Sequence, residues 1–223
     1  MVAAVVFDLD GTLIDSAGDI AGALNRLLTD EGRPNLTVAQ VAQLVGEGVH
    51  VLIERAWSQT GRPAETGDIP DLARRYLAYY AENPADETTV FEGVPEALGA
   101  LKAQGWTIGI CTNKPDAITS SVLSRVGLSP LIDGVVGGDV PRRKPDGEHI
   151  LETLRRLGAD LGSSLYVGDS VTDVKAARSA EIPIICVAFG YAQTTPEALG
   201  ADIMIPSFDK LCDAVSKLST SRA

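Results

Sequence analysis

The chain has 223 residues, of which 45% are hydrophobic and 22% are charged, with a formal net charge of −11 and a pI near 4.6. These proportions are typical of globular proteins and exclude disorder and fibrous repeats. Because an acidic chain has no overall basic field to attract a phosphate backbone, we expect no nucleic-acid partner. A small anionic substrate stays open, since a bound Mg²⁺ and a few local cations can reverse the potential inside one cleft.

The first residues carry no basic leader, and their apolar run stops at Asp8. We therefore expect neither a signal peptide nor a membrane span, and a cytoplasmic location. The histidines, His50 and His149, are too few and too far apart to suggest a zinc site. The cysteines are odd in number and show no CxxC spacing, which favours reduced, buried thiols: Cys111, Cys186 and Cys212.

The first predicted element is a buried strand over residues 3–7, an apolar run with β-branched Val at its centre. Asp8 and Asp10 follow at the carboxyl end of this strand, where α/β folds bind ligands, and side chains two apart in an extended chain share a face. Two neighbouring carboxylates repel one another unless a cation or a proton lies between them, so we favour a divalent metal here. The alternative is a plain turn, because Asp and the following Gly11 are both common turn residues.

The stretch 13–83 shows helical spacing almost throughout and no convincing strand. Apolar residues recur with a helical period in three places, at 24–28, 49–56 and 72–80. Residues 37–40 have the form of a capping box, which predicts the start of a further helix. We interpret this block as a small helical domain inserted just after the first strand.

From Val90 onward, strand-like runs alternate with helical patterns. The predicted strands are 107–111, 134–136, 165–167, 184–187 and 204–205, and the predicted helices are 95–104, 115–126, 147–157, 170–180 and one from residue 207. Repeated strand-helix units predict an α/β protein with a doubly wound parallel sheet, a Rossmann-like core. We place the core at 1–13 and 86–223 and the inserted helical domain at 14–85. After Leu218 the chain has no apolar pattern, and we expect it to fray.

Polar side chains also follow the strand at 107–111. They are Thr112, Asn113 and Lys114. A hydroxyl and an amide in front of a helix N-terminus are suited to binding phosphate oxygens. The alternative is that Thr112 or Asn113 only caps the helix.

A cationic run precedes Pro145 and consists of Arg142, Arg143 and Lys144, which is unusual in so acidic a chain. Such a run is most often a solvated turn. A functional role for Lys144 is favoured only by the neighbouring strand-end signals.

A third carboxylate, Asp169, follows the next predicted strand, and Asp173 lies one helical turn further on the same side. Asp169 near Asp8 and Asp10 would complete an oxygen-rich site of the kind that Mg²⁺ accepts. The alternative is that Asp169 and Ser170 only cap the helix that follows. Each signal is weak alone, but their occurrence in order at successive strand ends predicts one shared site.

Together these stretches resemble the motifs of the haloacid dehalogenase-like hydrolase superfamily. The stretches are Asp8 to Thr12, Thr112 with Asn113, Lys144 with Pro145, and Gly168 through Asp173, and the likeness covers nearly the whole chain. By this resemblance, the inserted helices correspond to the small α-helical cap of one subgroup. That subgroup holds phosphoglycolate phosphatases, β-phosphoglucomutases and several sugar-phosphate and nucleotide phosphatases.

Within the subgroup the chain is most similar to the phosphoglycolate phosphatase family, through looser stretches at 44–48, 91–94, 111–115, 190–191, 201–202 and 207–209. Two departures stand out. Asp146-Gly147 follows Lys144-Pro145, where many relatives carry another Pro. Ser179-Ala180-Glu181 replaces an Asn-Ala-Gly helix end, which removes a glycine suited to a left-handed C-cap at a cost of about 1 kcal/mol.

The resemblance implies a catalytic role for the first motif. Asp8 would be the nucleophile, forming an aspartyl-phosphate with the substrate. Asp10 would protonate the departing alkoxide and then take a proton from the water that hydrolyses the intermediate. Mg²⁺ would be held by Asp8, Asp169 and the main-chain carbonyl of Asp10. The presence of Asp10 argues against dehalogenase chemistry, in which no leaving alkoxide needs a proton.

The other motifs would hold the phosphoryl group. By resemblance, Lys144 is catalytic and binds the non-bridging oxygens together with the Thr112 hydroxyl and the Asn113 amide. Asp173 would position Lys144 or a water ligand of the metal. Specificity would lie in the cap, where the loop Gly46 to Gly48 could reach the site and His50 or Arg55 could meet a substrate carboxylate. A plain helix-joining turn with surface charges is the alternative there.

We therefore expect a Mg²⁺-dependent phosphomonoesterase that hydrolyses 2-phosphoglycolate. The alternatives are a phosphatase for another small phosphate ester, such as a sugar phosphate or nucleotide, and a hexose-phosphate phosphomutase. A non-catalytic binding protein is disfavoured because no motif residue is replaced. The expected partner is a small phosphorylated substrate, with no nucleic acid and no membrane, and the chain would be a monomer or a homodimer.

Overall fold

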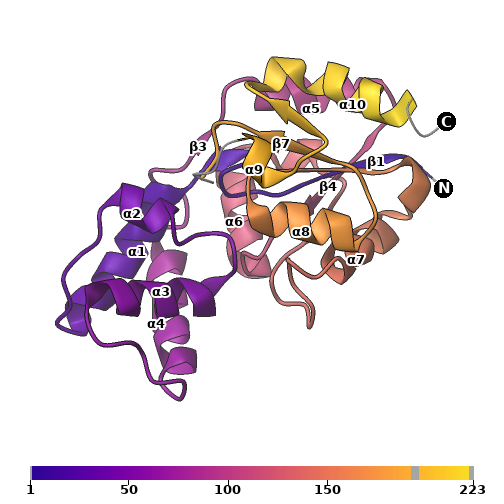
Figure 1. Cartoon of the computed structure of the whole chain (residues 1–223). Helices are drawn as coiled ribbons and strands as arrows, with labels where there is room; N and C mark the ends of the chain where they lie inside the picture. Colours follow the sequence, from indigo (N-terminus) through magenta and orange to yellow (C-terminus); the bar gives the residue numbers. More distant parts are fainter. Residues whose placement is uncertain (1, 192–195, 221–223) are drawn as a thin grey trace.

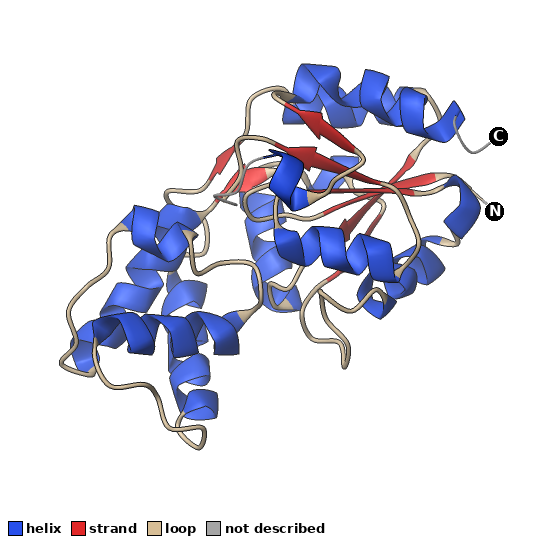
Figure 2. Ribbon diagram, viewed as in Figure 1, coloured by secondary structure: helices blue, strands red, loops and turns tan. Residues whose placement is uncertain are grey.

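The computed structural model describes residues 2–191 and 196–220. Its centre is β1 (Ala4–Phe7), which lies in a six-stranded sheet of order β5-β4-β1-β6-β7-β8 in which every neighbouring pair is parallel. The other strands are β4 (Thr107–Cys111), β5 (Gly134–Val136), β6 (Leu165–Gly168), β7 (Ile184–Val187) and β8 (Ile203–Ile205). The predicted α/β fold with a doubly wound parallel sheet is confirmed (Figure 2).

The apolar side chains of β1 alternate between the two faces of the sheet, which explains why helices cover both faces. Val5 and Phe7 belong to one apolar cluster, with α5 (Val94–Ala103), α6 (Asp116–Arg125) and α10 (Leu211–Thr220). Ala4 and Val6 belong to the other, with α7 (Glu148–Leu157) and α8 (Val171–Ser179). Because successive side chains of a strand point to opposite faces, a fully apolar strand needs helices on both.

The chain order places a topological switch point at β1. From β1 the chain passes to β4 and β5 on one side, and then to β6, β7 and β8 on the other. The carboxyl ends of β1, β4 and β6 therefore meet where the winding reverses. In open α/β sheets this is where ligands bind.

A block of helices lies apart from the sheet, at the lower left in Figure 1. It contains α1 (Ala17–Asp30), α2 (Val38–Ala42), α3 (Val49–Thr60) and α4 (Ile69–Glu82). The predicted capping box is present, since Thr37 accepts from the Gln40 backbone N–H and Gln40 accepts from the Thr37 backbone N–H. We propose that 14–85 form a cap domain on a core of 1–13 and 86–223.

A short antiparallel ribbon joins the two parts of the chain. It pairs β2 (Ile14–Asp15) with β3 (Thr89–Val90), close to both proposed domain boundaries. This ribbon was not predicted, since the helical spacing of 13–83 indicated no strand near Ile14. Strands this short carry no period-two pattern, so only the pairing of distant segments defines them.

Other differences concern short or terminal elements. The short helices η1 (Ser129–Leu131), η2 (Leu161–Ser163) and α9 (Pro196–Leu199) were not predicted, whereas the helix predicted from residue 207 begins as the short helix η3 (Phe208–Lys210) and continues as α10. Fraying after Leu218 is wrong for Ser219 and Thr220, which continue α10 and whose hydroxyls donate to carbonyls one turn back. The rest of that expectation, at 221–223, lies outside the described residues. Among the described helices, none combines the length and apolarity needed to cross a membrane.

The end of α8 keeps a left-handed residue without the glycine that suits it. Glu181 has φ 58°, the sole positive φ among described residues other than glycine. Gly147 packs against this end so closely that a Cβ there would lie 2.5 Å from the Ala180 backbone nitrogen. The two departures from the family pattern are therefore neighbours in space.

We expect Glu181→Gly to raise the free energy of unfolding by about 1 kcal/mol, because glycine adopts this conformation without a Cβ clash. Urea unfolding measures the change. Glu181→Ala is the matched control, since it removes the carboxylate with its interactions but keeps the Cβ. An equal gain in both variants would assign the effect to the carboxylate and refute the backbone argument.

Candidate active site

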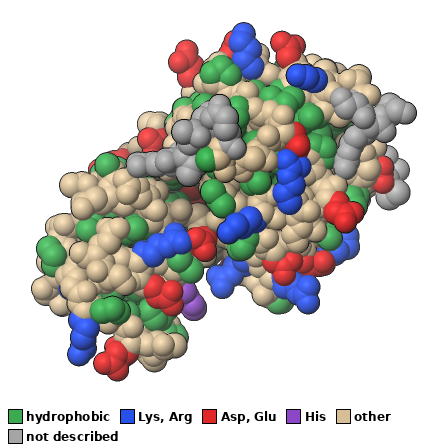
Figure 3. All heavy atoms as spheres, viewed as in Figure 1, with side chains coloured by type: hydrophobic (Ala, Val, Ile, Leu, Met, Phe, Trp, Pro, Cys, Tyr) green, Lys and Arg blue, Asp and Glu red, His purple; other side chains and the backbone are tan. Residues whose placement is uncertain are grey.

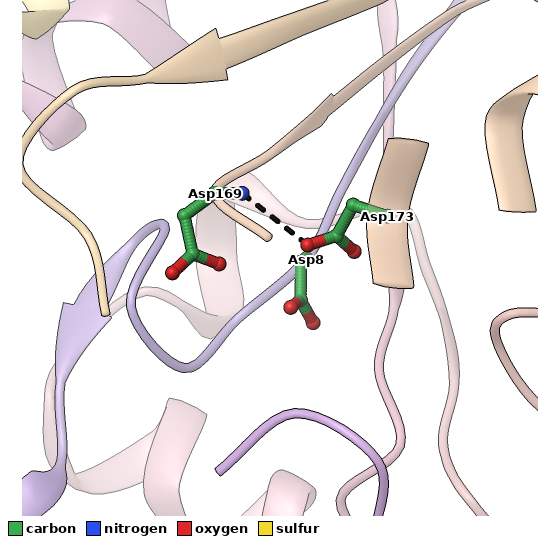
Figure 4. Close-up of side chains that lie close together, drawn as sticks. All are labelled: Asp8, Asp169 and Asp173. Carbon is green, nitrogen blue, oxygen red and sulfur yellow. Dashed lines mark hydrogen bonds between the residues drawn. The ribbon is translucent and has the colours of Figure 1, made fainter. Parts of the chain in front are cut away.

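The carboxyl ends of β1 and β6 bring three buried carboxylates together. Asp8 directly follows β1, and its backbone N–H donates to the Val167 carbonyl of β6 at 2.9 Å. Asp8, Asp169 and Asp173 each offer an oxygen within 4.8 Å of the others. Figure 4 shows the three side chains close together. This cluster contains two of the three predicted metal ligands, with Asp173 in place of Asp10.

Lys144 reaches this cluster from the loop before α7. Its Nζ lies 2.8 Å from Oδ1 of Asp8 and 2.8 Å from Oδ1 of Asp173, and it donates to the Tyr166 hydroxyl at 3.0 Å. Lys144 is only 3% exposed, whereas Arg142 and Arg143 are exposed. The solvated-turn interpretation therefore fits the two arginines but not Lys144.

Charge is unbalanced in the cluster. Burial raises the pKa of Asp8 to about 7. The attraction of Lys144 lowers this pKa, and the repulsion of Asp173 raises it further. Burial and repulsion by Asp173 and Asp8 raise the pKa of Asp169 well above its usual value. One ammonium thus faces three carboxylates, and hard oxygen donors with excess negative charge are what a divalent cation requires. The residues present fit such an ion.

Asp173 is committed to protein partners on both oxygens. Oδ1 accepts from Lys144 and from the Tyr166 hydroxyl, while Oδ2 accepts from the Ser170 hydroxyl at 2.6 Å and the Asp169 backbone N–H at 3.3 Å. Burial opposes its ionised form, but Lys144 and these donors hold the pKa of Asp173 below its usual value. Asp173 is therefore placed to orient Lys144. Ser170 also caps α8, as the capping alternative predicted.

Asp169 is held from two directions. Its Oδ1 accepts from the Thr12 hydroxyl at 3.2 Å, and its Oδ2 accepts from the Tyr191 backbone N–H at 2.7 Å. Gly11, at φ 81°, passes so close that a Cβ there would lie 2.6 Å from Asp169 Oδ2. The glycine after Asp10 is thus required by the close approach of the two strand-end loops.

Asp10 pairs with Lys114, a lysine for which no role was predicted. Lys114 Nζ lies 2.8 Å from Asp10 Oδ1, and the Ser16 hydroxyl donates to the same oxygen. The Lys114 side chain is buried, at 3% exposure, and the Asp10 side chain is 10% exposed. The motif around Thr112 contains Lys114, but only the fold shows that it turns toward Asp10.

Thr112 and Asn113 differ in what they can offer. The Thr112 hydroxyl accepts from the Lys114 backbone N–H at 3.2 Å, which leaves its own hydrogen to donate. The Asn113 amide donates to the carbonyls of Gly46 and Lys144, both at 2.8 Å. With both amide hydrogens engaged, Asn113 in this conformation links the helical block to the Lys144 loop.

Two clefts open beside these residues, and the segment Val45–Gly46 borders both. The first lies between the strand ends and the helical block and is lined by Asp8, Asp10, Thr112, Asn113, Lys114, Pro115, Ile20, Val45, Gly46, Gly48, Val49, Leu52, Tyr76, Leu77 and Tyr80. The second opens toward Asp169 and Ser170. In the space-filling view the surface is notched between the two lobes (Figure 3).

His50 and Arg55 are in neither lining. His50 is exposed, and Arg55 pairs with Glu47 and donates to the Leu44 carbonyl. Arg55 thereby braces the loop that borders the clefts. The alternative of surface charges on a helix-joining turn fits these two residues better than a direct contact with substrate.

The buried side chain of His149 holds the backbone of the loop that carries Lys144. Its Nδ1 accepts from the Lys144 backbone N–H at 3.2 Å, and its Nε2 lies 3.1 Å from the Gly137 carbonyl, so the neutral Nε2–H tautomer serves both. The ring is 1% exposed. Burial, and then the charge of Lys144, lower its pKa from 6.5 to about 4.

We expect this histidine to make stability depend on pH. Between about pH 6.5 and 4 the unfolded chain binds a proton that the folded chain does not, so the free energy of unfolding falls by about 3 kcal/mol as the pH falls through this window. Urea unfolding at several pH values measures the slope. In His149→Asn, which keeps an acceptor near Nδ1, this part of the slope should vanish. An unchanged slope would refute the assignment.

Comparisons with known proteins identify the family of the chain. The family model for haloacid dehalogenase-like hydrolases matches residues 5–187. A phosphoglycolate phosphatase of Caulobacter vibrioides is 40% identical over 220 residues, covering 98% of this chain and 93% of the relative. One of Rhodospirillum rubrum is 39% identical over 96% of this chain and 90% of its own. The crystal structure of a predicted phosphoglycolate phosphatase from Haemophilus somnus 129pt superposes with a TM-score of 0.87 at 29% identity, covering 96% and 97% of the two chains.

Proposed function

The chain belongs to the haloacid dehalogenase-like hydrolase family, and we propose that it is a Mg²⁺-dependent phosphomonoesterase that hydrolyses 2-phosphoglycolate to glycolate and phosphate. The observation that carries the proposal is the placement of Asp8, buried at the switch point with Lys144 against one oxygen and Asp169 nearby. The named substrate rests on the relatives called phosphoglycolate phosphatases, which match nearly the whole chain.

Asp8 is proposed as the nucleophile. Its carboxylate oxygen attacks phosphorus, the bond from phosphorus to the ester oxygen breaks, and an aspartyl-phosphate forms. Lys144 then neutralises charge on Asp8 and on the phosphoryl oxygens, while the Thr112 hydroxyl donates its hydrogen to one of these oxygens. Asp173 and Tyr166 hold the Lys144 ammonium in place throughout.

Asp10 is proposed as the acid and base. It gives a proton to the glycolate oxygen as that oxygen leaves, and later takes one from the water that hydrolyses the aspartyl-phosphate. The proton thus passes from Asp10 to glycolate and is restored from water. Before the substrate binds, the Ser16 hydroxyl and Lys114 both hold the Asp10 carboxyl group in place.

We propose that Asp8, Asp169 and the main-chain carbonyl of Asp10 hold Mg²⁺. When bound, Mg²⁺ supplies positive charge that offsets the repulsion between an anionic nucleophile and an anionic phosphate. Support comes from the uncompensated buried carboxylates described above, whose hard oxygens suit this ion.

The helical block is proposed to exclude water and to select the substrate. It supplies the apolar wall of the first cleft, and the Asn113–Gly46 hydrogen bond joins it to the catalytic loops. Lids of this kind close over the substrate before the chemical step. The cap would then determine which leaving group fits beside Asp10.

The proposal is tested by phosphate release from a panel of esters in the presence of Mg²⁺: 2-phosphoglycolate, hexose phosphates, nucleoside monophosphates and pyrophosphate. We expect the highest kcat/KM for 2-phosphoglycolate, with no release after chelation of the metal. Asp8→Asn is the blank that removes contaminating phosphatases. A preference for another ester would withdraw the named substrate, and little release without an added hexose bisphosphate would favour a phosphomutase.

A further inference from the structure

The first cleft has an unusual composition for a site that binds an anion. Its cap wall is apolar and aromatic, with Ile20, Val45, Val49, Leu52, Tyr76, Leu77 and Tyr80. Its floor holds Asp8 and Asp10. Lys114 is the cationic residue among the described lining residues. A hydroxyl-rich sugar would have to bury its polar groups against this apolar wall without partners, which is costly.

Lys114 is placed beyond the reacting atoms rather than on them. Its ammonium is 2.8 Å from Asp10, the proposed proton donor to the leaving oxygen, whereas Lys144 is the cation on Asp8. In 2-phosphoglycolate the carboxylate is one methylene away from that leaving oxygen. A group that contacts Asp10 is therefore at the distance where the substrate carboxylate must lie.

The cap side completes the surroundings of this ammonium. Lys114 Nζ lies 4.7 Å from the centroid of the Tyr80 ring, a cation–π contact between strand-end loop and cap helix. The Tyr80 hydroxyl is buried and has no hydrogen-bond partner among the described residues. A buried hydroxyl without a partner is rare in a folded protein and often indicates a missing water or ligand.

We propose that Lys114 binds the carboxylate of the substrate and so selects an α-phosphorylated acid over neutral esters and sugar phosphates. In the free enzyme Asp10 forms an ion pair with the Lys114 ammonium. When the substrate binds, its carboxylate takes the place of Asp10 in this ion pair. The Tyr80 ring, through its cation–π contact, keeps the Lys114 ammonium at the edge of the apolar wall. This inference rests on the proposed function. It assigns the contact with the substrate carboxylate to Lys114 and not to His50 or Arg55, which lie outside both cleft linings.

The test compares 2-phosphoglycolate with its neutral isostere, the 2-phosphoglycolic amide, in the wild type and in Lys114→Met. The wild type should prefer the acid in kcat/KM by roughly 100-fold, because the amide carries no anion that could replace Asp10 at the buried ammonium. In Lys114→Met this preference should fall to within a few-fold. The ratio cancels any loss that Lys114→Met causes through Asp10 alone, since that loss applies to both esters.

Lys114→Arg should restore part of the preference for the acid, because it restores the charge. If Lys114→Met folds poorly, Lys114→Arg still tests whether a cation at this position sets the preference. Lys175→Met, an exposed lysine on α8, is the control and should keep the preference of the wild type. Equal losses for both esters in Lys114→Met would overturn the proposal and leave Lys114 as a residue that only positions Asp10. If the wild type hydrolyses neither ester but cleaves others, the proposed function fails instead.

Discussion

Asp8→Asn is expected to reduce phosphate release by about 10⁴-fold or more, because an amide cannot act as the nucleophile and the remaining groups do not replace it. The folded state should not suffer. Burial disfavours the charged form of Asp8, as its raised pKa of about 7 shows, and Lys144 keeps Asp173 as a partner. Replacing one of three clustered carboxylates with a neutral isostere should leave the free energy of unfolding unchanged or higher.

Steady-state phosphate release and urea unfolding of the same preparations measure the two effects. Loss of activity without loss of stability is the expected pair of results. An Asp8→Asn protein that keeps more than about 1% of wild-type activity would contradict the role of Asp8 as nucleophile. A large loss of stability would contradict the charge balance described for the cluster.

Lys144→Met is expected to lower the free energy of unfolding by about 3–5 kcal/mol and to abolish turnover, because it leaves Asp8 and Asp173 buried without their cation. Burial alone would lower the pKa of Lys144, but Asp173 and Asp8 raise it above the ordinary value, so this lysine stays charged in the folded protein. The variant should remain folded only at reduced denaturant concentrations.

A second substitution separates the two losses. In Lys144→Met/Asp173→Asn the amide oxygen can accept from Ser170 and Asp169, and the amide nitrogen can donate to the Tyr166 hydroxyl. Stability should recover in part, whereas activity should stay lost because no cation faces Asp8. Unfolding midpoints and phosphate release are the readouts. If the double variant is less stable than Lys144→Met, the ion-pair account of the site is wrong.

The strand-end residues could be predicted because parallel strands carry a simple rule. Asp8, Thr112 and Asp169 each follow an apolar run directly, and the carboxyl ends of neighbouring parallel strands share one edge of the sheet. The position of each residue just after its own strand is therefore enough to predict that these residues, far apart in the sequence, lie close together. The same rule places Lys144 less well, since it lies on a long loop before α7 rather than at a strand end.

The partners of these residues could not be predicted, because they depend on contacts across long sequence separations. Lys114 is 104 positions from Asp10, and its run of neighbours fits a helix start as well as a site. The Asn113 amide is predicted to bind phosphate oxygens, and the sequence did not indicate that in this structure it donates to the carbonyls of Gly46 and Lys144. Glu181 shows the reverse case, in which the fold keeps a left-handed turn that its own residue disfavours.

The aspartyl-phosphate on Asp8 is the most direct test of the proposed chemistry. Asp10→Asn should slow both formation of the intermediate, because the leaving oxygen gains no proton, and its hydrolysis, because no carboxylate then takes the proton from water, so the reaction is sampled over long times. The measurement is a single turnover of this variant with 2-phosphoglycolate and Mg²⁺, quenched in acid, reduced with borohydride and mapped by peptide mass. We predict homoserine at position 8 and none in Asp8→Asn/Asp10→Asn. Phosphate release without any reduced residue, or with one at a carboxylate other than Asp8, would contradict the account.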